Sequence, residues 1–180
     1  AEQAALLSKD NEILATEVRE TISALQLLYE RTQTFGTPPK EALRAAIFTN
    51  PAAFQARWIS PEGMELIRFD RQRDRIVEIP PGQLQDKSTR DYYSAMMRLS
   101  VGQIYISAFD LNIENDQIEV PFKPTVRIGI RASDGFILAN LNLSHLFSSV
   151  RASSYSEHET WLVNKQGDWL IAPDSSLEWG

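Results

Sequence analysis

Two arginines that could bind an anion alternate with apolar residues in the run 125–132. If this run is a β-strand, Arg127 and Arg131 project from one face, with the small Gly129 between them. A guanidinium group offers paired N–H donors that match a carboxylate or a phosphate, and glycine leaves space beside it. The pattern therefore predicts an anion-binding surface. The alternative is that Arg127, like Arg68, forms an internal ion pair with Asp70, Asp110 or Glu65.

Two hydroxyl groups and a further arginine could add to that surface. Tyr105 and Ser107 share one face of the run 103–109, so both hydroxyls can meet a ligand beside the arginines. Arg90 lies at the start of an expected helix, 90–99, whose aromatic and methionine side chains would face the sheet. A small molecule held between this helix and the sheet would then meet donors from both.

The other arginine-rich segments are interpreted as structural. Arg68 lies in a second strand-like run and is expected to pair with Asp70, Asp110 or Glu65 inside the domain. The segment 71–75 contains three arginines beside acidic residues and is expected to form a solvated turn. Neither segment therefore adds to the predicted ligand set.

The sequence lacks the patterns of most catalytic and metal-binding chemistry. It has no cysteine, which excludes thiol catalysis, disulfides and thiolate zinc sites. His145 and His158 lack a second ligand at metal spacing, and no nucleophile elbow, phosphate loop or acid–base couple stands out. A net charge of −6 and a pI near 5.0 argue against a nucleic-acid surface. We therefore predict no catalytic residue, no metal ligand and no cofactor.

Five strand-like runs are expected to form an antiparallel sheet. Each is apolar or alternating and is bounded by turn signals. Ser133-Asp134-Gly135 between the last two runs is a strong hairpin signal, because glycine accepts a positive φ. The five runs are 54–60, 64–70, 103–109, 125–132 and 136–142.

Helices are expected to flank this sheet. Residues 4–34 contain no proline or glycine, and their apolar residues recur with helical spacing, which predicts one long helix with an apolar stripe. Because the stripe is longer than a small sheet can cover, it could form a parallel dimer seam or pack only on its own domain. Shorter helices are expected over 37–48 and 145–151. The stripe comprises Leu7, Leu14, Val18, Ile22, Leu25 and Leu28.

A second hairpin is expected after a polar linker at 152–157. The apolar runs 160–164 and 168–172 are joined by a Lys165-Gln166-Gly167 turn, and no further sheet follows to complete a module. The expected helices and antiparallel strands together place the chain in the α+β fold class. The expected divisions are 1–36, a long helix; 37–143, one complete module; and 144–180, a connecting helix, a linker and the opening hairpin of a second module.

Five stretches of the chain resemble the extracytoplasmic double-Cache sensor domains of bacterial receptors, a PAS-like (PDC) family. Four are similar to the first, membrane-distal module and one to the opening of the second, in matching order. This resemblance implies a PAS-like module with a five-stranded antiparallel sheet flanked by helices. The stretches are 55–68 (QARWISPEGMELIR), 84–93 (LQDKSTRDYY), 102–114 (GQIYISAFDLNIE), 119–127 (EVPFKPTVR) and 161–180 (WLVNKQGDWLIAPDSSLEWG).

The resemblance also implies a cellular role. It points to the periplasmic part of an inner-membrane histidine kinase, diguanylate cyclase or chemoreceptor, with transmembrane helices in the parent protein and any catalysis in a cytoplasmic domain. Such a domain binds a small molecule between sheet and covering helix and is expected to form a homodimer through its N-terminal helix. The alternative is a ligand-silent module that relays signals from a periplasmic binding protein.

Family members that bind amino acids carry a motif of arginine, any residue, tryptophan and tyrosine, with two aspartates for the ligand amine. Arg90 and Tyr93 match the first and last motif positions, and Tyr92 replaces the tryptophan. Asp110 matches the first aspartate, whereas Asn142 replaces the second and lacks its charge. The resemblance therefore favours an organic anion or a neutral metabolite over an amino acid. The predicted ligand-binding residues are Arg90, Tyr92, Tyr93, Tyr105, Ser107, Asp110, Arg127 and Asn142.

Overall fold

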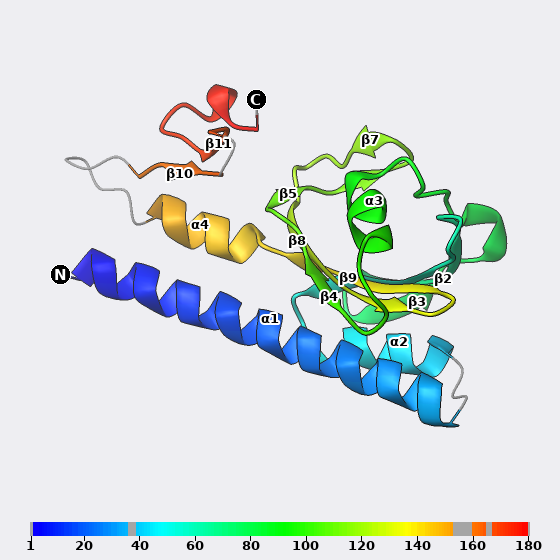
Figure 1. Ribbon diagram of the computed structural model, residues 1–180. Helices are drawn as coiled ribbons and strands as arrows, with labels where there is room; N and C mark the ends of the chain where they lie inside the picture. The colour runs from blue at the N-terminus through cyan, green and yellow to red at the C-terminus, as the bar shows by residue number, and fades with distance from the viewer. Residues whose placement is uncertain (1, 36–38, 153–159, 165–166, 180) are drawn as a thin grey trace.

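The computed structural model describes residues 2–35, 39–152, 160–164 and 167–179, and a seven-stranded antiparallel sheet forms its centre (Figure 1). Six strands follow the order β3-β2-β1-β9-β8-β4, and β5 pairs with the first residues of β8. The strands are β1 (Ala53–Ile59), β2 (Glu65–Gln72), β3 (Arg75–Glu78), β4 (Ile104–Ile106), β5 (Asp110–Leu111), β8 (Pro124–Ala132) and β9 (Gly135–Asn142).

Two short antiparallel pairs of strands lie outside this sheet. The first is a hairpin of β6 (Ile113–Glu114) and β7 (Gln117–Ile118), on the α3 side of the sheet. The second consists of β10 (Leu162–Val163) and β11 (Trp169–Ile171), near the C-terminal end. This second pair matches the hairpin that was expected from the sequence after residue 160.

Helices cover both faces of the sheet (Figure 1). On one face lie α1 (Glu2–Phe35) and α2 (Pro39–Thr49), and on the other lies the short α3 (Asp91–Met97). After β9, α4 (Ser144–Ala152) runs beside α1. In the part of the chain that the structure describes, no helix combines the length and the hydropathy of a membrane span. Two single 3₁₀ turns complete the elements, Pro81–Gln83 and Ser175–Leu177.

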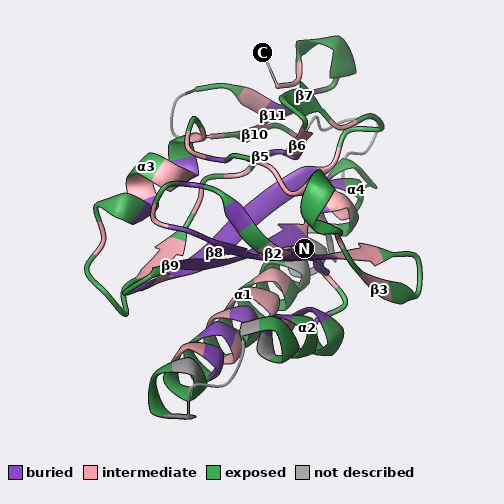
Figure 2. Ribbon diagram, turned by 90° about the vertical axis from the view of Figure 1, so that its right-hand side faces the viewer, coloured by how far each residue is buried: buried purple, intermediate pink, exposed green. Residues whose placement is uncertain are grey.

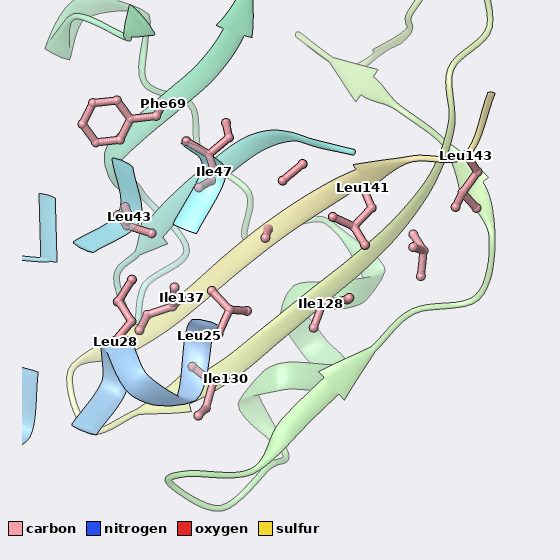
Figure 3. Packing of buried hydrophobic residues seen from close by; sticks show 14 of the residues in the cluster. Leu25, Leu28, Leu43, Ile47, Phe69, Ile128, Ile130, Ile137, Leu141 and Leu143 are labelled. Atoms are coloured by element: carbon pink, nitrogen blue, oxygen red, sulfur yellow. The ribbon is translucent and has the colours of Figure 1, made fainter. Parts of the chain in front are cut away.

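The main hydrophobic core lies between the sheet and the pair of helices α1 and α2 (Figure 3). Strand alternation places every second residue of β8 and β9, from Val126 to Ile130 and from Ile137 to Leu141, on this face, so that they meet the apolar stripe of α1 and the inner side of α2. Burial of each large aliphatic side chain contributes roughly 1.5–3 kcal/mol. The core contacts join Leu25, Leu28, Leu43 and Ile47 on the helices to Ile128, Ile130, Ile137 and Leu141 on the strands.

The apolar stripe of α1 packs on its own domain over most of its length. The stripe residues from Leu14 to Leu28 are buried or pack against the core, whereas the side chain of Leu7 lies outside the described residues. Ile13 and Leu27 lie beside the stripe and stay 41% and 52% exposed. The helix therefore supports its domain and still carries apolar side chains at its surface.

Two glycines allow close approaches that any side chain would block. The β8–β9 hairpin turns at 133–134, as predicted, and a Cβ atom on Gly135 would lie 2.1 Å from the carbonyl oxygen of Ile59 on β1. On the opposite face of the sheet, a Cβ atom on Gly129 would lie 2.5 Å from the Cε atom of Met96. Gly129 thus lets α3 settle directly on β8.

The face beneath α3 is divided into an apolar and a polar part. The side chains of α3 pack on a small cluster that includes Ile59, Phe136 and Leu138. The polar part is buried as deeply as the apolar part. Figure 2 shows the central strands β8 and β9 buried and the outer sides of α1 and α2 exposed. Buried polar residues on this face are Gln55, Arg57, Arg68, Arg127 and Asn140.

The sheet has two more strands than the five expected. The expected strands correspond to the central order β2-β1-β9-β8-β4, and β3 and β5 add to its edges. The segment 71–75, expected as a solvated turn, turns only at 73–74, because Arg71 and Gln72 pair with the start of β3. The run 103–109 is extended in β4 over three residues only. Short edge strands are held by main-chain pairing and leave little alternation in the sequence.

Several expectations concern residues outside the described ranges. These are residue 36 at the end of the first expected division, residues 153–157 of the expected linker, His158 and residues 165–166 of the expected turn.

Candidate functional site

A cavity of about 560 Å³ opens where the start of α3 meets the β4 and β8 edge of the sheet. This volume lies within the range of roughly 300–1,000 Å³ that is typical of small-molecule sites. Six of the eight predicted ligand residues line it: Arg90, Tyr92, Tyr105, Ser107, Asp110 and Arg127. Thr89, Asp91, Ala108, Phe109, Ile113, Asn164 and Asp168 complete the lining.

Arg127 forms the buried floor of the cavity, with only 4% of its side chain exposed. Its guanidinium group donates to the carboxylate of Asp110 at 3.2 Å and to the carbonyl oxygen of Leu111 at 3.2 Å. It also lies over the ring of Tyr92, 5.4 Å from the ring centre. Burial lowers the pKa of Arg127, and Asp110 counteracts that effect. The Nε atom has no hydrogen-bond partner among the described residues.

The hydroxyl groups of the cavity differ in how far they are free to meet a ligand. Ser107 donates from Oγ to the carbonyl oxygen of Ala108 and accepts from the backbone N–H of Arg127, so its hydroxyl is already used. Tyr105 is half-buried, and desolvation raises its pKa. Tyr92 is buried, and desolvation raises its pKa as well. Both phenols therefore stay protonated and can donate to an acceptor.

Arg90 and Asp91 place one charge of each sign at the mouth of the cavity. Arg90 is the N-cap residue of α3, and Asp91 is its first residue. Neither side chain forms a hydrogen bond or an ion pair with another described residue. Their guanidinium and carboxylate groups are therefore available to a ligand. Asp91 was not among the predicted ligand residues, although it directly follows the predicted Arg90 in the sequence.

The β10–β11 pair supplies another wall of the cavity. Asn164 and Asp168 flank its turn and join each other, because the Asn164 amide donates to the Asp168 carboxylate at 2.8 Å. The pair is anchored on α4, where Arg151 binds Glu178 and the ring of Phe147 stacks on that of Trp179. No signal in the sequence indicated that a hairpin so late in the chain would reach this cavity.

Tyr93 and Asn142 lie apart from the cavity. The hydroxyl of Tyr93 donates to the carbonyl oxygen of Pro61 at 2.8 Å, and its ring packs edge-on against Phe136. Asn142 accepts from the backbone N–H of Ser144 at the start of α4, at 2.8 Å. Its side chain lines a different cavity of about 340 Å³ between α1 and α4. The structure therefore gives both residues local structural contacts.

A buried ionic cluster occupies the sheet face next to this cavity. Arg57 binds Glu65 at 2.9 Å, and Arg68 binds Asp70 through two hydrogen bonds of 2.8 and 2.7 Å. Glu114 from β6 reaches down between the two arginines, 2.7 Å from Arg57 and 2.8 Å from Arg68. Arg68 thus has the internal partners that the sequence predicted, and Arg127 has the Asp110 partner that was the alternative.

Electrostatics within the cluster are strongly coupled. Burial alone would raise the pKa of Glu114, but Arg57 and Arg68 outweigh it and lower that pKa to about 2. The pKa of Lys87 is lowered to about 8 by burial and by Arg57. The pKa of Arg68 is raised, because its bonds to Asp70 outweigh the opposing effect of burial. The cluster is therefore ionised around neutral pH.

The arrangement is suited to binding rather than to catalysis. Its charged groups are held in ion pairs or lie at the cavity mouth, and among the residues that line the cavity in the described part of the chain no nucleophile is positioned beside a base. Among the described residues, no group of three or more histidine, aspartate and glutamate side chains could hold a metal ion.

Structures with the same fold belong to sensory proteins. The match to the extracellular domain described as histidine kinase vpHK1S-Z8 spans 99% of this chain and 68% of that chain, with 22% identity and a TM-score of 0.73. The chain covers 72% of a sensory box/GGDEF family protein from Vibrio parahaemolyticus, with 22% identity and a TM-score of 0.72. It covers 69% of the ligand-binding domain of the Campylobacter jejuni chemoreceptor Tlp3 in complex with L-valine, with 13% identity and a TM-score of 0.63. These likenesses establish the fold.

A family model gives the stronger assignment. Residues 41–180 match the model of the bacterial histidine kinase sensor domain, whereas no curated protein shows a significant match. The family is one of sensor domains, which agrees with the prediction that this chain is not an enzyme. The expected extracytoplasmic location agrees with the description of the first relative as an extracellular domain. The chain therefore belongs to the family of bacterial histidine kinase sensor domains.

Proposed function

We propose that this sensor domain binds a small organic acid in the cavity beside α3. The observation that carries the proposal is the convergence of Arg90 and Arg127 on one cavity of about 560 Å³. A carboxylate between them would meet the free guanidinium group of Arg90 at the mouth, and the buried guanidinium of Arg127 would add a second positive charge from the floor of the cavity. The phenol of Tyr105 can donate to the same group.

The acidic residues around the cavity define the rest of the ligand. Asp91 and Asp168 are exposed at its rim and can accept hydrogen bonds from hydroxyl or amino groups. A polar organic acid, such as a hydroxy acid, can bind the arginines through its carboxylate and the acidic residues through its hydroxyl group. An amino acid is the second candidate, because the Campylobacter jejuni relative of the same fold was solved with L-valine. Asn142 no longer argues against it, since this residue lies in another cavity.

The ligand-silent alternative, a module that relays signals from a periplasmic binding protein, predicts a cavity that is filled by side chains. The face beneath α3 is filled in part, by the ionic cluster around Glu114, yet the cavity between Arg90 and Asp168 stays open. A domain that only relays contacts would gain nothing from an open cavity lined by free charges. This contrast favours the ligand sensor.

Signal transfer would use the elements that the cavity joins. A ligand that binds one arrangement of α3 and the β10–β11 pair more tightly shifts the population toward that arrangement. The exposed side chains of Ile13 and Leu27 on α1 suit a parallel homodimer, through which the shift would reach the membrane. Residues 144–180 would then open a second module in the parent receptor, which continues through transmembrane helices to a cytoplasmic output domain.

Calorimetric titration with organic acids, amino acids and polyamines tests the ligand proposal. We expect one class of acid to bind, and Arg90→Ala to weaken that binding by at least about tenfold, since a charged hydrogen bond is lost. Arg98→Ala is the matched control, because Arg98 is exposed at the other end of α3. Absence of binding by every compound, or equal loss in both variants, would exclude the site.

A further inference from the structure

The carboxylate of Glu114 is bound in the way that receptors bind a ligand. Its Oε1 atom accepts from Arg57 at 2.7 Å and from the Gln55 amide at 2.9 Å. Its Oε2 atom accepts from Arg68 at 2.8 Å and from the Gln85 amide at 3.0 Å. Lys87 lies 4.0 Å from the same oxygen. The Asn112 amide donates to Oε1 as well, at 3.4 Å. Three cations and three amides therefore converge on one carboxylate.

The two arginines belong to the main sheet of the domain, whereas the carboxylate does not. Arg57 and Arg68 project from neighbouring strands of the main sheet, where their Cα atoms are directly paired. Glu114 belongs to the β6–β7 hairpin, which forms its own two-stranded sheet. Ile118 and Val120, in β7 and just after it, are 48% and 80% exposed. Glu114 is thus the deep anchor of a hairpin that otherwise lies at the surface.

The charges show that this pocket requires an anion from outside the sheet. Arg57 already has Glu65, and Arg68 already has Asp70, so these four charges balance. Lys87, with 5% of its side chain exposed, is the further cation of the cluster, and Glu114 balances it. Without Glu114 the pocket would hold one uncompensated buried positive charge and free amide donors.

We infer that Arg57, Arg68 and Lys87 form a second carboxylate-binding site, which Glu114 occupies as an internal ligand and which a small free carboxylate can occupy in its place. The site is separate from the cavity at Arg90 and does not depend on the function proposed for that cavity. Its ligand class is a carboxylate on a short stem, because Glu114 reaches the site with one side chain. When a free carboxylate takes the site, the β6–β7 hairpin loses its anchor.

In the wild-type protein, the Glu114 side chain competes with any free carboxylate for this site. Glu114 is tethered, so its effective concentration at the site is in the millimolar range or above. A free carboxylate competes poorly with it in the wild-type protein and binds readily once the internal ligand is removed. Glu114→Ala removes that competitor and leaves the three cations in place. Asp116→Asn is the matched control, because it removes one exposed carboxylate from the same hairpin.

The experiment is chemical rescue of Glu114→Ala by acetate or formate, measured as the thermal unfolding midpoint against chloride at equal ionic strength. We expect the variant to unfold on the order of 10 °C below the wild type. Acetate at tenfold excess over its dissociation constant should restore about 4 °C. The wild type and Asp116→Asn should respond equally to acetate and chloride.

Two results would overturn the inference. The first is a variant that responds no better to acetate than to chloride. The second is an equal response of the variant and the wild type, which would show a general effect of the anion. If Glu114→Ala does not fold in chloride, recovery of folded protein on dilution into acetate supports the site, and failure in both salts refutes it.

Discussion

Arg57 and Glu114 lie 57 positions apart in the chain, yet their side chains meet at 2.7 Å on the sheet face beneath α3. Arg57 is buried at the centre of the sheet on β1, and Glu114 comes from a hairpin outside it. This pair joins the polar interior to the surface loop that covers it. Such a buried pair is costly to break, because removal of one partner leaves the other as a buried charge that neither an ion-pair partner nor water compensates.

Because of Glu114, the unfolding free energy of the domain should decrease as the pH becomes acidic. The pKa of Glu114 is about 2 in the folded protein, below the ordinary value of 4.5, so folding is favoured by the ionised form. That contribution is complete above pH 4.5 and is lost as the pH falls toward 2. At neutral pH we expect Glu114→Gln to lower the unfolding free energy by about 3 kcal/mol. Urea denaturation of both proteins between neutral pH and pH 3 should show this difference shrinking; parallel pH profiles would contradict the assignment.

Asp110→Asn should distinguish an anionic ligand from an ammonium ligand. Asp110 holds Arg127 at 3.2 Å, and its replacement by the neutral amide frees the guanidinium for a ligand carboxylate. We expect an organic acid to bind about fivefold more tightly. An amine that used Asp110 would instead bind more weakly. Titration calorimetry measures either change, and Asp116→Asn provides the control for loss of one surface charge; an unchanged affinity would exclude contact with Arg127.

Asp168→Ala should weaken ligand binding without destabilising the free domain. Asp168 is exposed and, among the described residues, bonds with Asn164 of its own hairpin, so the midpoint of thermal unfolding should change little. Loss of one hydrogen bond to the ligand predicts about a five- to tenfold weaker affinity. Asp134→Ala, at the exposed β8–β9 turn, should leave affinity unchanged. Equal affinities for all three proteins would show that the β10–β11 pair does not contact the ligand.

Gly129→Val should push α3 away from the sheet. The new Cβ atom would meet the Met96 Cε atom at 2.5 Å and the carbonyl oxygen of Ile137 at 3.0 Å. Overpacking of this kind costs about 1–3 kcal/mol, and it should also weaken ligand binding, because α3 carries Arg90. Gly82→Ala introduces a Cβ atom into open space and serves as control. Thermal unfolding checks the first effect and calorimetry the second; a variant as stable as Gly82→Ala would refute the packing argument.

The central fold could be predicted because its signals are local. Alternation in 125–132 separates Val126 from Arg127, and these residues indeed face the main core and the α3 side. The turn at Asp134 and the stripe of α1 also follow from short-range patterns. The edge strand β3 was missed, because main-chain pairing with β2 holds it and no alternation marks it.

The candidate site could be predicted only where it lies on elements with a clear pattern. Arg57 alternates with Ala56 and Trp58 just as Arg127 alternates with its apolar neighbours, yet Arg57 was not predicted as a residue of the polar face. Glu114 and Asp168 carry no such pattern, because they lie in short hairpins whose position depends on tertiary contacts.

The origin of the cavity walls has a consequence for how the receptor would work. Thr89 and Asp168 line the same cavity from positions 79 residues apart, one at the start of α3 and one in the hairpin of the expected second module. A molecule bound between them acts as a reversible cross-link, which restricts the relative motion of two parts that the chain joins only through α4 and the following segment. The free energy of binding would then appear as cooperativity between modules, so that the two would unfold as one unit with ligand and more independently without it.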